Sequence, residues 1–320
     1  MSRFLPDPFI LALLATVALA TLLPANGHTA VQVGYVATAA VVLLFFLHGV
    51  RLPRENLVAA LGHWRLHLLI LGTTFVFIPL FGALLQRLFP GLLPANLWAG
   101  VLFLCALPST VQASIAYTSM AQGNIAAAVA SAAASNLLGI AATPLIAGLL
   151  LHTTGGDVPL SGIWKVVLQL LLPFVVGHAL RPWLGSWAGR QRRLLTWSDR
   201  LTILLSVYAA FSAAVVAGIW SQVPLLTLLV LALVCIAILL AALLFTTGSA
   251  RLAGLPATDA RTVLYCGSLK SLVSGVPMAR VLFPSAEIGA IILPVMIYHQ
   301  LQLMICATIA RRQGRETGRP

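Results

Sequence analysis

Long apolar blocks separated by short polar segments form the dominant pattern of this chain. Each block approaches the roughly 20 apolar residues that a helix needs to cross a bilayer. The pattern continues along the whole chain and therefore predicts an all-α polytopic membrane protein with ten transmembrane helices. The ten blocks cover residues 8–24, 31–49, 67–87, 97–119, 124–151, 163–181, 201–220, 223–246, 260–283 and 287–310.

Composition supports this prediction. Of 320 residues, 60% are hydrophobic and only 8% are charged, and mean hydropathy is +1.00. Ordinary soluble domains are about 25% charged, so a soluble enzyme, a secreted disulfide scaffold and a disordered chain are excluded. The first block also resembles a signal peptide, but the many spans after it favour a membrane helix. The four cysteines lie in apolar stretches without metal-ligand spacing, so we expect no metal and no cofactor.

The basic residues, which give a net charge of +12, predict the orientation of the helices. Fifteen lie on one side of the ten-span arrangement, whereas the opposite loops contain only Arg87 and Lys165. Cytoplasmic loops carry such an excess, so we expect both termini in the cytoplasm and the protein in the cell inner (plasma) membrane. No basic domain lies outside the spans, which argues against nucleic-acid binding. The fifteen are Arg3, Arg51, Arg54, Arg65, Arg181, Arg190, Arg192, Arg193, Arg200, Arg251, Arg261, Arg311, Arg312, Arg315 and Arg319.

The fourth and ninth blocks differ from the others because helix breakers occur among hydroxyl residues at mid-span. The breakers are Pro108 in the fourth block and Gly267, Gly275 and Pro277 in the ninth. Irregular backbone at membrane depth is tolerated only where it is buried in protein or lines a watery cavity. We therefore predict that helices four and nine are discontinuous.

The two blocks also occupy matching places in the chain. Cys105 and Cys266 are 161 positions apart, and the same offset aligns Ser109 with Lys270. Five spans per half is an odd number, so the halves enter the membrane with opposite orientations. We predict one transporter domain over 1–320, with inverted five-helix repeats at about 1–156 and 157–320, because interrupted helices at matching places indicate a transporter site.

Lys270 is the single residue for which the sequence most strongly indicates a functional role. A lysine at the bilayer centre costs about 2.5–3.5 kcal/mol on insertion scales and is usually kept for a functional reason. No Asp or Glu lies in a span core to pair with it. We therefore expect its ammonium to contact half-helix C-termini, hydroxyls, water or an anionic ligand.

His178 lies inside the sixth block and His299 at mid-span in the tenth, whereas the other five histidines lie near loops or span ends. Either His178 or His299 could relay protons near neutral pH. A buried histidine bonded to a carbonyl is the commoner arrangement, so both interpretations stay open.

These residues resemble the bile acid:sodium symporter superfamily, specifically its SBF-like branch. The resemblance covers almost the whole chain and is carried by several short motifs together. It implies ten helices in two inverted repeats, a panel that moves against a core, and broken helices four and nine that cross at the substrate site. The motifs lie at 6–9, 45–49, 64–68, 108–111, 123–124, 136–139 and 266–271.

The chain departs from this family where sodium-coupled members bind sodium. By the resemblance, Ser114 is kept, but other sodium-binding positions carry residues without the expected oxygens. Sodium prefers several hard oxygens with negative charge, so the resemblance implies transport without implying sodium coupling. The departing positions are Ile115, Ala128, Ala132, Tyr265 and Leu269.

We therefore expect a secondary active transporter that moves a small organic anion by alternating access, with protons as a candidate coupling ion. Lys270 would provide a fixed positive charge in place of a bound cation. The alternatives are a non-transporting membrane regulator and an intramembrane hydrolase that uses Ser268 with Lys270. The candidate binding residues are Ser109, Thr110, Gln112, Ser114, Asn136, Ser268, Lys270, Ser271 and His299.

Overall fold

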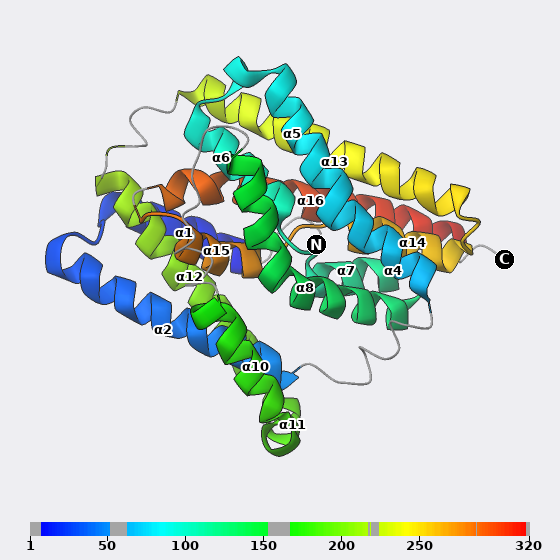
Figure 1. Ribbon diagram of the computed structural model, residues 1–320, viewed down its shortest axis with the longest axis horizontal. Coiled ribbons are helices and arrows are strands. Elements are labelled where there is room, and N and C mark those ends of the chain that lie inside the picture. Colours follow the sequence, from blue (N-terminus) through cyan, green and yellow to red (C-terminus); the bar gives the residue numbers. More distant parts are fainter. Residues whose placement is uncertain are drawn as a thin grey trace, which may run out of the picture. The chain divides into compact units, whose positions relative to one another are not determined.

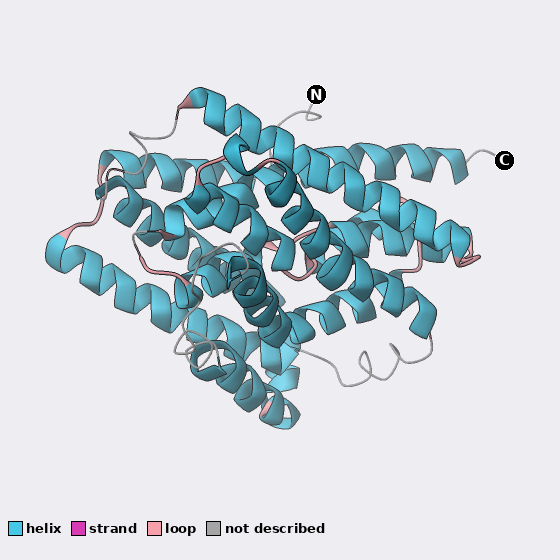
Figure 2. Ribbon diagram, turned by 45° about the horizontal axis from the view of Figure 1, so that its top comes forward, coloured by secondary structure: helices cyan, strands magenta, loops and turns pink. Residues whose placement is uncertain are grey.

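The computed structural model describes residues 8–51, 63–152, 167–216, 218, 224–285 and 287–317. Regular structure is helical throughout these ranges, and Figure 2 shows helices and loops without a strand among them. The chain divides into two compact units, each of which takes segments from both halves of the sequence. Unit 1 comprises Met1–Arg51, Leu160–Pro224 and Val276–Ala290, and unit 2 comprises Leu52–Pro159, Leu225–Gly275 and Ile291–Pro320.

Unit 1 is built on the long helix α2, which packs against α10 and α12, while α1 packs against α12 (Figure 1). Glycines allow the close approach of α2 and α10, as small residues do between membrane helices. A Cβ on Gly49 would lie 2.1 Å from the Phe174 carbonyl oxygen, and one on Gly177 would lie 2.0 Å from that of Phe46. The described elements of unit 1 include α1 (Pro8–Leu22), α2 (Gly27–Arg51), the π-helical turn η3 (Val167–Leu171), α10 (Leu172–Ala179), α11 (Arg181–Arg190) and α12 (Arg192–Val216).

Unit 2 contains the remaining helices, apart from the part of α15 and the start of α16 that lie within Val276–Ala290 of unit 1. The unit boundaries fall inside α15 and near the start of α16, so the first turn of α15 belongs to unit 2. The elements are α4 (Trp64–Gly72), the π-helical turn η1 (Thr73–Phe77), α5 (Ile78–Leu88), η2 (Pro90–Leu92), α6 (Ala95–Ala106), α7 (Val111–Met120), α8 (Ile125–His152), α13 (Leu225–Leu252), α14 (Ala257–Ser268), α15 (Leu272–Leu282) and α16 (Ile288–Thr317).

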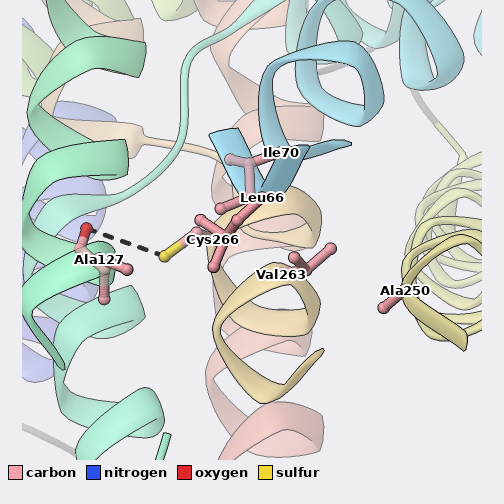
Figure 3. Close-up of a cluster of buried hydrophobic side chains, with 7 residues drawn as sticks. Leu66, Ile70, Ala127, Ala250, Val263 and Cys266 are labelled. Atoms are coloured by element: carbon pink, nitrogen blue, oxygen red, sulfur yellow. Dashed lines mark hydrogen bonds between the residues drawn. The ribbon is translucent and has the colours of Figure 1, made fainter. Parts of the chain in front are cut away.

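A buried apolar cluster joins α4, α8, α13 and α14 in unit 2 (Figure 3). The thiol of Cys266 donates a weak hydrogen bond to the carbonyl of Ala128 at 3.9 Å, drawn as the dashed line. This packing anchors α14 just before the chain leaves the helix at Ser268. The members of the cluster are Leu66, Ile70, Ala127, Ala128, Ala250, Val263 and Cys266.

Among the described residues, six helices are long and apolar enough to cross a membrane, and the number of candidate spans is seven when α6 and α7, which are bent by 59° at their break, are counted together as one span. Two shorter apolar helices cover Leu11–Leu22 and Leu168–Ala179. Large apolar side chains project outward from the spans; on α13, Leu229, Leu233 and Leu244 are all more than half exposed. The protein is therefore a polytopic helical membrane protein.

The connection between the sixth and seventh blocks differs from the prediction. The apolar blocks at 163–181 and 201–220 leave residues 182–200 as a polar connection, but α11 and the first turns of α12 occupy it. Hydropathy misses these turns because they are rich in arginine, which is a good helix former. Several predicted features lie outside the described residues, namely Arg3, Arg54, Lys165, Arg319 and the repeat boundary near 156.

Candidate functional site: two paired helix breaks

The first break covers Leu107–Thr110, between α6 and α7, and its cause is local. Pro108 has no backbone N–H and disfavours helical backbone at the residue before it. Leu107 is accordingly extended, with ψ of 151°. The discontinuity predicted from Pro108 is confirmed.

Polar side chains of α8 hold this break in place. The hydroxyl of Thr143 donates to the carbonyl of Ala106 at 2.9 Å, where α6 ends. The amide of Ser109 donates to Ser135 Oγ at 3.0 Å, and Asn136 Nδ2 donates to the carbonyl of Ser109 at 2.8 Å. These bonds replace the partners that the backbone loses where the helix stops.

The second break lies at Leu269–Ser271, between α14 and α15. Leu269 is extended, with ψ of 142°. The predicted discontinuity is present, but its predicted causes are wrong, because Gly267 lies inside α14 and both Gly275 and Pro277 lie inside α15. The chain leaves the helix instead at the residues around Lys270.

The two breaks bond directly to each other within unit 2. The backbone amide of Ser271 donates to the carbonyl of Pro108 at 2.9 Å. The hydroxyl of Thr110 donates to the carbonyl of Lys270 at 2.6 Å. Unsatisfied groups of one break are therefore paired with groups of the other.

Asn136 forms a second connection between the breaks. Besides its bond to the Ser109 carbonyl, its Oδ1 accepts a hydrogen bond from Ser274 Oγ at 2.8 Å. Ser274 is in the first turn of α15, and its amide donates to Ser271 Oγ at 3.1 Å. Ser271 thus acts as the N-cap of α15.

The ammonium of Lys270 is held by three backbone carbonyls. Its Nζ lies 2.8 Å from the oxygen of Thr74 and 2.7 Å from those of Cys105 and Leu107. Cys105 and Leu107 are at the C-terminus of α6, where the helix dipole favours a positive charge. The residue is only 1% exposed, and no carboxylate of the described residues forms an ion pair with it. The expected contact with a half-helix C-terminus is confirmed.

The side-chain amide of Gln302 on α16 clamps the backbone of Lys270. Gln302 Oε1 accepts from the Lys270 amide at 2.8 Å, and its Nε2 donates to the Lys270 carbonyl at 2.9 Å. The same Nε2 lies 2.9 Å from His299 Nδ1. The clamp replaces the helical partners that Lys270 loses at the break.

Ser268 and Ser114 extend the polar network, whereas Gln112 stays outside it. Ser268 Oγ lies 3.2 Å from Thr246 Oγ1, and Ser114 Oγ lies 3.3 Å from Ser109 Oγ. Gln112 is exposed. The Lys270 ammonium donates its hydrogen bonds to the carbonyls of Thr74, Cys105 and Leu107. These bonds give no support to a pair in which Lys270 activates Ser268 as a nucleophile.

Sequence reasoning did not select Gln302, Thr74 or Ser274, although each contacts the breaks. Gln302 had a visible signal, since a glutamine at mid-span is expensive to bury without a partner. Thr74 contributes its backbone carbonyl to Lys270, and no sequence pattern identifies that oxygen. His178 follows the commoner arrangement, because its Nδ1 lies 3.3 Å from the carbonyl of Gly49.

Comparison with known proteins gives consistent matches along the chain. The sequence profile of the SBF-like CPA transporter family matches residues 7–315. The Escherichia coli (strain K12) protein named "Putative symporter YfeH" is 47% identical over 311 residues, which cover 97% of this chain and 94% of that protein. The Pseudomonas aeruginosa protein PA2026 is 51% identical over 315 residues, or 98% of this chain and 94% of that protein. Sodium/bile acid cotransporter 7 of Danio rerio is 27% identical over 317 residues, or 95% and 93% of the two chains.

Proposed function

The chain belongs to the SBF-like CPA transporter family, and from this premise we propose that it is a secondary active transporter that moves a small organic anion by alternating access. The observation that carries the proposal is the Lys270 ammonium, which is buried where two broken helices bond to each other. Buried charge at membrane depth is costly and typically marks a substrate or ion pathway.

The proposed architecture has ten transmembrane helices in two inverted repeats, about 1–156 and 157–320, with helices four and nine crossing at the site. Two observations support it. The breaks follow the 161-residue offset, and each compact unit combines corresponding parts of the two halves. Unit 1 contains the opening segments of both halves together with Val276–Ala290, and unit 2 contains the other segments. The two units therefore combine the chain segments in the way expected of the moving panel and the core that the resemblance implies.

Lys270 is proposed to replace a bound cation. Three carbonyl oxygens at 2.7–2.8 Å surround its Nζ, which is the kind of oxygen set that a metal cation uses. At the positions where the resemblance leads us to expect sodium ligands, Ser114 is kept, Tyr265 replaces a carboxylate, and Ile115, Ala128, Ala132 and Leu269 have no side-chain oxygen. A covalently attached positive charge would give the site the electrostatic character of a cation-loaded transporter without sodium.

The anion is proposed to bind beside this charge, because the ammonium uses its three N–H groups on carbonyls. Hydroxyls and amides at the breaks would provide its hydrogen bonds, and the N-termini of α7 and α15 would add positive potential. The proposed binding set is Ser109, Thr110, Gln112, Ser114, Asn136, Ser268, Lys270, Ser271 and His299.

The proposed location is the cell inner (plasma) membrane, with both termini in the cytoplasm. The distribution of fifteen basic residues on one side against two on the other supports this orientation. Protons are the proposed coupling ion, since the sodium ligands expected from the resemblance are replaced. The protein would act without a cofactor or nucleic-acid partner.

Uptake into proteoliposomes tests the proposal. Purified protein is reconstituted and assayed with radiolabelled monocarboxylates, dicarboxylates, sulfonates and taurocholate, with protein-free liposomes as the control. We expect uptake of at least one anion class, and no change when choline replaces sodium at constant pH. Absence of uptake for the whole panel would favour a membrane regulator. Steep sodium dependence would contradict the proposed replacement of sodium by Lys270.

A further inference from the structure

The backbone of Lys270 fixes the orientation of the Gln302 amide. A backbone N–H only donates and a carbonyl only accepts, so Oε1 must face the Lys270 amide and the NH₂ group must face the Lys270 carbonyl. The second hydrogen of that NH₂ group points to His299 Nδ1 at 2.9 Å. His299 Nδ1 must therefore be an acceptor, which means that it carries a lone pair and no proton.

A proton on His299 Nδ1 is incompatible with this arrangement. It would come from water, occupy the lone pair and turn the acceptor into a second donor facing the Gln302 NH₂ group. Rotating the amide would bring Oε1 to the new N–H, but it would also place oxygen against the Lys270 carbonyl and NH₂ against the Lys270 amide. The bond between Gln302 and His299 would be regained, but both contacts between Gln302 and the Lys270 backbone would become repulsive. Protonation of His299 and closure of the clamp therefore exclude each other.

We propose that His299 is a proton-binding site whose occupancy opens the Gln302 clamp and removes the bonds from Gln302 to the Lys270 backbone. This inference rests on the proposed function and identifies the coupling ion of the same site. The protonated form has two positive charges, on His299 and Lys270, to attract an anion. Loss of both the anion and the proton restores the clamp. His299 acts here as a positioning residue for Lys270.

Lys270 is the charged residue that hydrogen bonds through Gln302 connect to His299. Helices α7, α13 and α14 each donate a side-chain hydrogen bond to α16. The tyrosines and cysteines that they bring are neutral near pH 7. The ionisable groups in these bonds, at the second break and near His299 in the sequence of α16 are Tyr117, Cys235, Tyr265, Lys270, Tyr298 and Cys306. The other ionisable residues of α13, α14 and α16 are Arg251, Asp259, Arg261, Cys266, Arg311, Arg312, Arg315 and Glu316.

Hydrogen–deuterium exchange of the whole protein in lipid nanodiscs tests this switch. The measurement follows peptides that span the second break between about pH 5 and pH 8, where a histidine titrates, and corrects for intrinsic exchange. In the wild type we expect protection of the Lys270 amide to fall about tenfold per pH unit once His299 binds its proton. In His299→Gln a carbonyl oxygen can accept from Gln302 and cannot be protonated, so protection should be independent of pH.

Two other buried or half-buried histidines provide matched controls. His178→Gln changes a histidine of unit 1, and His67→Gln changes one in unit 2 whose Nδ1 lies 2.7 Å from Ser131 Oγ and whose buried Nε2 has no hydrogen-bond partner. Both variants should retain the wild-type pH response. The proposal is overturned if wild-type protection does not change with pH, if His299→Gln keeps the response, or if His67→Gln removes it.

If the His299→Gln variant does not fold, a measurement on the wild-type protein tests the same proposal. Solid-state NMR of ¹⁵N-histidine protein should show His299 with Nδ1 unprotonated at high pH, and a protonated Nδ1 at high pH overturns the proposal. The outcomes also separate the two proposals. Anion uptake without the exchange response contradicts only the proton switch, whereas the exchange response without uptake of any anion contradicts the transport function and supports the switch.

Discussion

The two helix breaks are similar in geometry and different in cause. The first is favoured locally by Pro108, whose ring acts on the neighbouring backbone in any fold, and side chains of α8 also hold it. The second contains no proline, and its backbone is held by the side chain of Gln302, 32 residues further along the chain. A break that proline also favours does not depend on one hydrogen-bonding side chain, whereas a break without proline can open when its hydrogen bonds are lost. This difference identifies the second break as the adjustable one.

Removing the Gln302 clamp is expected to have the largest effect on stability. Gln302→Leu leaves the buried amide of Lys270 without a partner, which costs about 1–3 kcal/mol of unfolding free energy. Unfolding in mixed detergent micelles measures this loss. Gln300→Leu is the matched control, because Gln300 lies on the same helix and is only partly buried. Equal stability of the two variants would show that the clamp does not hold the second break.

An intermediate effect is expected for Asn136, which contacts both breaks. Asn136→Leu removes its bonds to the Ser109 carbonyl and to Ser274 Oγ. Ser274 keeps a partner in Ser271, so the net cost is about 1 kcal/mol, typical of a single hydrogen bond. The same unfolding assay, with the exposed Asn96→Leu as control, measures it. A loss as large as that of Gln302→Leu would show that the first break also depends mainly on tertiary contacts.

The smallest effect is expected for Pro108. In Pro108→Ala the bonds from Ser135, Asn136 and Thr143 remain, so the first break should persist and stability should change by less than about 1 kcal/mol. Cysteine cross-linking across Ala106 and Val111 can show whether the bend is kept. A straightened helix would mean that proline alone maintains the break, which would sharpen the contrast with Lys270.

Sequence patterns could predict what depends on local chemistry. The apolar blocks coincide with helices in the described residues, and Pro108 ends α6 close to where it was expected to. Helix α11 and the first turns of α12 were missed because hydropathy reports burial in lipid and carries little information on helix formation in polar segments.

The candidate site was predictable only in part, because its key bonds join residues distant in sequence. Lys270 was identified from the cost of its charge, and the absence of acidic partners left half-helix C-termini, hydroxyls, water or an anionic ligand as its expected contacts. The structure shows the first of these, at the C-terminus of α6. The role of Gln302 could not be read in advance, since nothing in the sequence specifies its distance from Lys270. Gly267, Gly275 and Pro277 were expected to break the helix, but they lie inside α14 and α15. Glycine and proline are tolerated within membrane helices because neighbouring helices satisfy the backbone groups that they free.

The measurement that tests the central claim most directly is anion uptake by Lys270→Ala in proteoliposomes. The assay uses the anion from the carboxylate, sulfonate and taurocholate panel that the wild type takes up fastest. Rates are normalised to folded protein by size-exclusion chromatography, and Lys165→Ala, which removes the chain's other lysine, is the control. The account predicts that Lys270→Ala falls to the level of protein-free liposomes while Lys165→Ala keeps the wild-type rate. Wild-type uptake by folded Lys270→Ala would contradict it.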